Sequence, residues 1–123
     1  MSTKKTGDYG EKLVAAYLRL KGYKILGKNF RTRSNEIDIV GYDGDTLCFI
    51  EVKARSRTDF GLPCEAVDMR KRQKIIKGAM YFVASHNLQC NVRFDVAEVY
   101  LNKGITIFPK VNIIKNAFDI SGR

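Results

Sequence analysis

Two strand-like segments flank a turn signal near the middle of the chain, and they constrain its fold more than any other feature. Residues 36–41 and 46–55 are rich in β-branched and apolar residues, and Asp43-Gly44 between them is a strong hairpin signal. Side chains alternate between the two faces of a strand. One face of the second strand is wholly apolar or small: Cys48, Ile50, Val52 and Ala54. This face is therefore predicted to pack on a core, while the other face turns from apolar to charged.

The remaining pattern predicts helices and strands on both sides of this hairpin. Asp8 and Glu11 have the spacing of a capping box, and Gly22 is a typical C-cap, so a helix is expected over 8–22. The other expected elements are a strand over 23–30, a loop over 56–64, a helix over 65–86, strands over 92–101 and 105–108, and an unassigned tail over 110–123. The order α-β-β-β-α-β-β predicts an α/β (mixed α+β) fold, a mixed β-sheet flanked by helices. A length of 123 residues fits one domain, 1–123.

Composition and charge narrow the classes of function. No apolar run approaches the roughly 20 residues of a membrane span. The three cysteines are scattered singly, which argues against a disulfide framework or a zinc site and favours a cytoplasmic location. The formal net charge of +9 suggests a polyanionic partner, nucleic acid rather than membrane. An ordinary basic soluble domain is the alternative.

Acidic residues gather on the charged face of the hairpin. A two-residue turn at Asp43-Gly44 would pair Asp38 with Phe49 and Glu36 with Glu51, which puts all three acids on one face. Asp38 and Glu51 would then be diagonal neighbours about 7–8 Å apart. Lys53 follows Glu51 on the same face, roughly 7 Å along the strand. A three-residue loop without a bulge would reverse this arrangement.

The cluster has the composition of a phosphodiesterase site. Close carboxylates raise one another's pKa unless a cation neutralises them, and Mg²⁺ or Mn²⁺ favours one or two carboxylates with water and phosphate oxygens. A nearby lysine stabilises the charge that develops on a phosphate. Asp38 and Glu51 are therefore the expected metal ligands, and Lys53 is expected to position the attacking water or to neutralise the charge on the phosphate. The alternative is a surface salt bridge across the two strands.

Basic residues flank this site along the sequence. Contacts with nucleic-acid phosphates are predicted for Arg31, Arg33, Arg55, Arg57, Lys71 and Lys74. For each of them a solvated face is the alternative. Asp95 is interpreted as a structural partner of Arg93 or another arginine rather than a catalytic acid.

These stretches together resemble the YraN family of small bacterial endonuclease-like proteins, within the PD-(D/E)XK nuclease superfamily. The resemblance covers roughly residues 7–100. Its matching stretches are 7–11, 15–18, 22–23, 29–31, Glu36-Ile37-Asp38, Phe49 to Arg55, Phe60-Gly61 and Arg93 to Val96. It departs from the family pattern at Ser34-Asn35, where glycines are usual.

The resemblance implies a restriction-endonuclease-like fold and a particular set of site residues. Asp38 and Glu51 would bind the metal and Lys53 would be the catalytic lysine, with Glu11 as an accessory acid. Glu36 is either an outer ligand or the partner of an arginine. Similar archaeal Holliday junction resolvases act as symmetric dimers, which by analogy implies a homodimer.

Three functions remain open from the sequence. The first is a Mg²⁺- or Mn²⁺-dependent DNA endonuclease, acting on branched, recombination or repair intermediates. The second is a nucleic-acid-binding protein that keeps the nuclease fold with little cleavage. The third is a nuclease subunit that needs a protein partner. Intact Asp38, Glu51 and Lys53 favour the first.

Overall fold

The computed structural model describes residues 3–33, 35–55, 67–100 and 110–123. Two helices and five strands follow one another in the predicted order α-β-β-β-α-β-β. They are α1 (Thr3–Leu20), β1 (Lys24–Arg31), β2 (Glu36–Asp43), β3 (Thr46–Arg55), α2 (Met69–Ser85), β4 (Asn91–Tyr100) and β5 (Lys110–Phe118).

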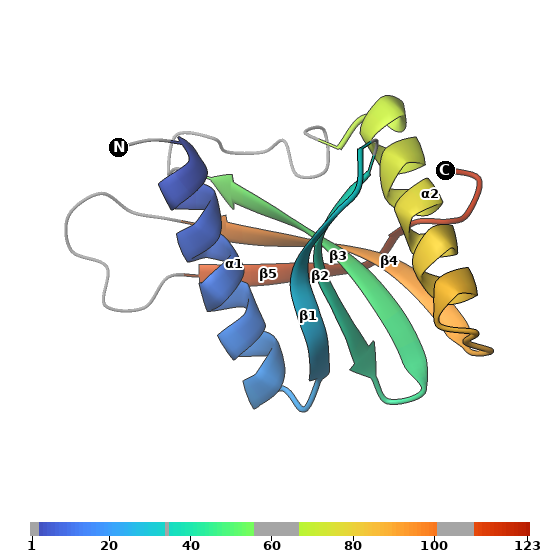
Figure 1. The fold of residues 1–123 in the computed structure, drawn as a ribbon. Coiled ribbons are helices and arrows are strands. Elements are labelled where there is room, and N and C mark those ends of the chain that lie inside the picture. Colours follow the sequence, from blue (N-terminus) through green and yellow to red (C-terminus); the bar gives the residue numbers. More distant parts are fainter. Residues whose placement is uncertain (1–2, 34, 56–66, 101–109) are drawn as a thin grey trace.

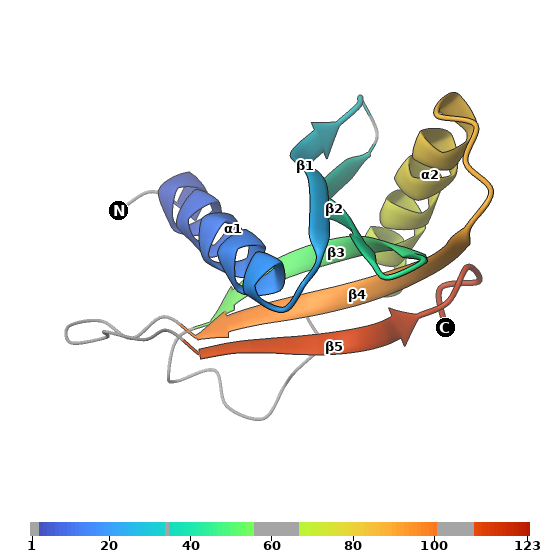
Figure 2. The same ribbon diagram turned by 90° about the horizontal axis from the view of Figure 1, so that it is seen from below.

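The strands form one mixed sheet in the order β1-β2-β3-β4-β5 (Figure 1). β3 and β4 are parallel, and α2 makes the crossover between them, since parallel neighbours need a long connection. The other three pairs are antiparallel. Figure 2 shows that β1 and β2 rise steeply from the line of β4 and β5, with α1 and α2 on either side. The predicted mixed sheet with flanking helices is confirmed.

Each face of the sheet packs on its own core. Leu47 and Phe49 of β3 join the core beneath α2, with Ile75 and Phe82 of that helix. Cys48 and Ile50 join the core beneath α1. Both faces of β3 are therefore buried, and the predicted alternation of this strand is confirmed.

The first helix starts earlier than its sequence pattern predicts. α1 begins at Thr3, so Asp8 lies within the helix and the predicted capping box there is wrong. The predicted C-cap is confirmed, because Gly22 has φ +94° and its N–H donates to Arg19 O at 3.0 Å. Tyr23 N donates to Leu18 O at 2.9 Å, which completes a Schellman motif.

The hairpin turn lies one residue later than predicted. Asp43 pairs with Thr46, so the two turn residues are Gly44 and Asp45, and Gly44 takes the required positive φ of +61°. Phe49 consequently pairs with Val40 instead of Asp38. The register moves by two residues, so the side chains of the paired segment 39–43 keep their predicted faces.

The last elements differ from the prediction in their bounds. α2 starts at Met69 rather than 65, because Asp68 is its N-cap and accepts a hydrogen bond from Lys71 N at 2.9 Å. The tail left unassigned contains β5. The predicted strand at 105–108 and loop at 56–64 lie outside the described residues.

Candidate active site

The site begins where β2 separates from β3. The ladder between these strands runs from Asp43–Thr46 to Ile39–Ile50. Beyond it, Asp38 Oδ2 accepts a hydrogen bond from Val52 N at 2.8 Å. The carboxylate thus accepts the hydrogen bond of a β3 amide that has no partner on the β2 backbone at this point.

The faces of β2 also change at this point. Ile37 packs in the core beneath α2 and Ile39 in the core beneath α1. Residues two apart in a regular strand share a face, so the strand turns about Asp38. The turn directs the Asp38 carboxylate into the fork between β2 and β3, towards Glu51.

Asp38 and Glu51 form a buried acid pair. Asp38 is 7% exposed and Glu51 is 4% exposed. The alternative of a surface salt bridge therefore does not describe this site. Among the described residues, Glu51 Oε2 is a buried oxygen without a hydrogen-bond partner. Buried carboxylate oxygens are ordinarily hydrogen-bonded, so this atom has capacity for a further ligand.

The electrostatics of the pair reflect its burial. Burial and, after it, the charge of the neighbouring Asp38 raise the pKa of Glu51 from 4.5 to about 7, against the lowering effect of Lys71 and Lys53. Burial also raises the pKa of Asp38, and the hydrogen bond from Val52 N opposes that rise. Holding two ionised carboxylates here is costly without a cation.

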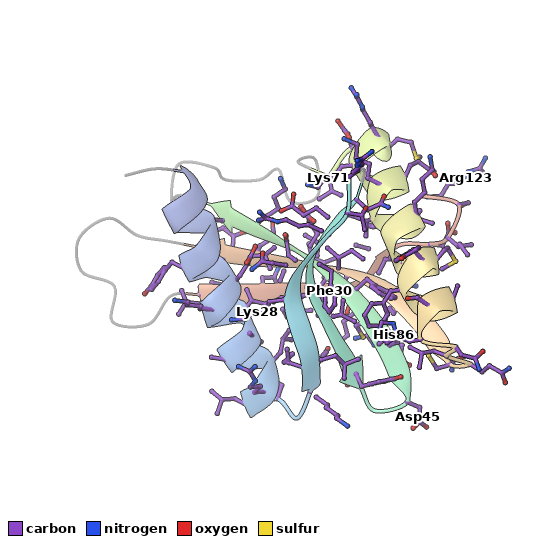
Figure 3. The ribbon with its side chains drawn as sticks, viewed as in Figure 1. Lys28, Phe30, Asp45, Lys71, His86 and Arg123 are labelled. Carbon is purple, nitrogen blue, oxygen red and sulfur yellow. The ribbon has the colours of Figure 1, made fainter. Side chains whose placement is uncertain are left out.

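A lysine from α2 supplies part of that positive charge. Lys71 Nζ lies 3.4 Å from Glu51 Oε1. Burial lowers the pKa of Lys71, but the charges of Glu51 and Asp38 outweigh this, and the pKa is raised. Figure 3 shows Lys71 at the start of α2, beside the ends of β1 and β2. The sequence pointed to Lys71 only as a phosphate contact, because its partner lies 20 positions away on another element.

Lys53 follows Glu51 on the face of β3 that looks towards α2. It is half-buried, and its charge lowers the pKa of Glu51. Its register partner on the parallel neighbour β4 is Glu98, a fully buried carboxylate. Glu98 Oε1 accepts a hydrogen bond from Asn112 Nδ2 at 3.2 Å. The sequence analysis missed Glu98, although an acid between the apolar residues of 94–99 was a signal for a buried polar role.

A groove adjoins the acid pair between the β1–β2 connection and α2. Its volume is about 210 Å³. The residues that line it are Thr32, Arg33, Asn35, Glu36, Lys71 and Lys74. Three of the predicted phosphate-contacting residues thus meet in one place. The side chain of Arg55 and all of Arg57 lie outside the described residues.

The two further candidate acids occupy different positions. Glu36 pairs with Arg31 at 3.3 Å on the surface, which is the arginine-holding role considered for it. Glu11 is 8% exposed, on the α1 stripe that also contains Val14 and Leu18, beneath the opposite face of the sheet. Both residues remain predictions as metal ligands.

The donors present suit a hard divalent cation. Among the described residues, no three His, Cys, Asp or Glu side chains form a group that could hold a metal ion. Mg²⁺, however, commonly uses only one or two carboxylates and takes its other ligands from water and phosphate. Asp38 and Glu51, with the unpartnered Oε2, fit that requirement.

Asp95 has a structural role, as expected. Its Oδ1 lies 2.9 Å from Arg93 Nε, and the same oxygen accepts from Asn116 N at 2.8 Å. Arg93 also donates to Asp43 Oδ2 at 2.9 Å. This network ties β4 to β5 and to the hairpin turn, away from the acid pair.

Within the part of the chain that the structure describes, no helix is long and apolar enough to cross a membrane.

Comparison with known proteins places the chain in a family. A UPF0102 protein of Caldanaerobacter subterraneus subsp. tengcongensis is 49% identical over 96% of this chain and 98% of its own length. One from Clostridioides difficile is 47% identical, covering 96% of this chain and its own full length. The model described as "Uncharacterised protein family UPF0102" matches residues 10–99. The chain therefore belongs to family UPF0102, the YraN family predicted from its motifs.

Proposed function

We propose that this protein is a metal-dependent endonuclease that hydrolyses phosphodiester bonds, with DNA as the favoured substrate. The observation that carries the proposal is the buried pair Asp38 and Glu51, with Glu51 Oε2 unpartnered among the described residues and Lys53 on the same face. Two buried carboxylates are a costly arrangement for a merely structural purpose. A cation site accounts for that cost.

Each residue has a distinct part in the proposed chemistry. Asp38 and Glu51 would hold Mg²⁺ or Mn²⁺, which when bound supplies Lewis-acid chemistry for the hydrolysis of a phosphate ester. The Val52 N–H bond fixes Asp38 in the fork between β2 and β3, so one ligand is preorganised. The Lys53 ammonium would bind a phosphate oxygen and stabilise the negative charge that grows there in the transition state.

The surroundings support a polyanionic substrate. Arg33, Lys71 and Lys74 line the groove beside the acid pair. The chain as a whole carries +9 formal charges. A strand of nucleic acid in this groove would gain affinity from phosphate contacts, which give position more than sequence specificity.

The test is a cleavage assay on labelled linear, single-stranded, flapped and four-way DNA with Mg²⁺, with Mn²⁺ and with EDTA. We expect cleavage that needs the metal and falls by at least about 100-fold in Glu51→Gln and Lys53→Met. Asp45→Asn is the acid control, since Asp45 is exposed in the hairpin turn at the far end of the β2–β3 ladder from the acid pair, and it should retain activity. Equal cleavage by wild type and Glu51→Gln would refute the assignment. DNA binding without cleavage by any metal would favour the binding-protein alternative.

A further inference from the structure

Lys71 stands between the two parts of the proposed site. Its Nζ is 3.4 Å from Glu51 Oε1, and its side chain also lines the groove with Arg33 and Lys74. Its side chain is 36% exposed, whereas that of Glu51 is 5% exposed. The ammonium thus faces a buried acid on one side and an open basic groove on the other.

The backbone of Lys71 is fixed while its side chain has reach. Lys71 is the third residue of α2, and its N–H donates to the N-cap Asp68 at 2.9 Å. Arg72 anchors the same turn by donating to Val67 O at 2.8 Å and Gly122 O at 2.9 Å. A lysine carries four rotatable side-chain bonds, so a fixed backbone still lets its ammonium choose between nearby partners.

The position is unfavourable for a cation on local grounds. The first turn of a helix carries partial positive charge, which disfavours lysine there. The acid pair offsets this cost through its ion pair with Lys71. A divalent cation at Asp38 and Glu51 would neutralise the same acids and remove the interaction that holds the ammonium.

We infer that Lys71 neutralises the acid pair when no metal is bound. Binding of a divalent metal to the acids, or of a nucleic-acid phosphate in the groove, would move the Lys71 ammonium from Glu51 to the groove. This inference rests on the proposed function and adds a coupling between its two ligands. Metal binding would release the Lys71 ammonium for a phosphate in the groove. A phosphate that engages Lys71 would in turn free Glu51 Oε1 for the metal. By linkage, each ligand must then strengthen binding of the other by the same factor.

The first test measures metal binding alone. Mn²⁺ affinity is measured by titration calorimetry at pH 8, without nucleic acid, for wild type, Lys71→Met, Lys71→Arg and Lys77→Met. We expect Lys71→Met to bind Mn²⁺ roughly 5–150-fold more tightly than wild type, the range typical of coupled sites. Lys71→Arg keeps a cation and should remain within about threefold of wild type. Lys77 is exposed on α2 outside the groove, so Lys77→Met controls for the loss of one charge.

The second test measures the coupling itself. Affinity for a short labelled DNA duplex is measured with and without Mn²⁺ in the Lys53→Met background, which prevents cleavage. Mn²⁺ should strengthen DNA binding at least about fivefold when Lys71 is present and have less than half that effect in Lys71→Met. Lys74→Met should weaken DNA binding and preserve the response to Mn²⁺.

The outcomes separate this inference from the proposed function. If wild type binds Mn²⁺ and Lys71→Met binds it equally or more weakly, the exchange is refuted and the metal site stands. If neither protein binds Mn²⁺, both proposals fail. Tighter binding in Lys71→Met, with wild-type affinity in Lys77→Met, supports the exchange whether or not cleavage is detected.

Discussion

Replacing Glu51 by glutamine should stabilise the metal-free protein, and the gain should grow with pH. The pKa of Glu51 is about 7 in the folded protein against 4.5 for the free side chain. The folded state therefore binds more protons than the unfolded chain between these values, and the free energy of unfolding falls as pH rises through that window. Glutamine occupies the same volume but does not ionise, so the free energy of unfolding of Glu51→Gln lacks this decrease with pH.

The size of the effect follows from the two pKa values. At about 1.4 kcal/mol per pKa unit, the rise from 4.5 to about 7 corresponds to about 3 kcal/mol. Glu51 is 4% exposed, so solvent screening reduces this value little. Burial raises the pKa of Asp38 as well.

The assay is urea denaturation in EDTA from pH 4 to pH 8.5. The unfolding free energy of Glu51→Gln minus that of wild type should be constant below pH 4.5. It should rise by about 3 kcal/mol between pH 4.5 and 7 and then level off. Glu36→Gln removes an acid from a surface ion pair, so its difference from wild type should stay within about 1 kcal/mol. A flat difference for Glu51→Gln, or one that falls with pH, would refute the reasoning about this buried acid.

Three further predictions concern metal binding, the hydrogen bond of Asp38 and the close packing of Gly41. Mg²⁺ at 100 times its Kd should stabilise wild type by about 2.7 kcal/mol and leave Glu51→Gln nearly unchanged, as measured by urea denaturation; equal stabilisation of both would show binding elsewhere. Asp38→Ala should be less stable than Asp38→Asn by about 1–3 kcal/mol, because alanine leaves the Val52 amide without its acceptor; hydrogen exchange at Val52 should accelerate in the alanine variant, and equal exchange rates would contradict this account. Gly41→Ala should lower the free energy of unfolding by about 1–3 kcal/mol in thermal denaturation, because the alanine Cβ would lie 2.9 Å from Lys24 O. A variant as stable as wild type would show that β1 can move away from this contact at little cost.

The proposed mechanism depends on strand separation more than on an acid cluster. In a continuous ladder, the β3 amides would be paired with β2, and Asp38 would stand on the pleat like any other strand residue. Separation after Ile39–Ile50 brings the Asp38 carboxylate to Val52 N and towards Glu51.

The sequence alone determined the order of the elements and the faces of β3. Alternation in 46–55 is a local property with a period of two. The predicted faces were still right although the turn lies one residue later than predicted, because the pairing of the strands shifted by two residues, an even number. The motif Asp38…Glu51-Val52-Lys53 therefore pointed to two acids that are both buried in the structure. Gly22 likewise marked the end of α1, since the chain needs a positive φ there.

Only the tertiary structure decided what surrounds that pair. β2 turns at Asp38 because Ile37 packs in the core beneath α2 and Ile39 in the core beneath α1. These two helices are far apart in the sequence. The approach of Lys71 to Glu51 and the burial of Glu98 depend on how α2 and β5 pack against the sheet. Local patterns carry no information about these long-range contacts, whereas they do fix which side of a strand a residue occupies.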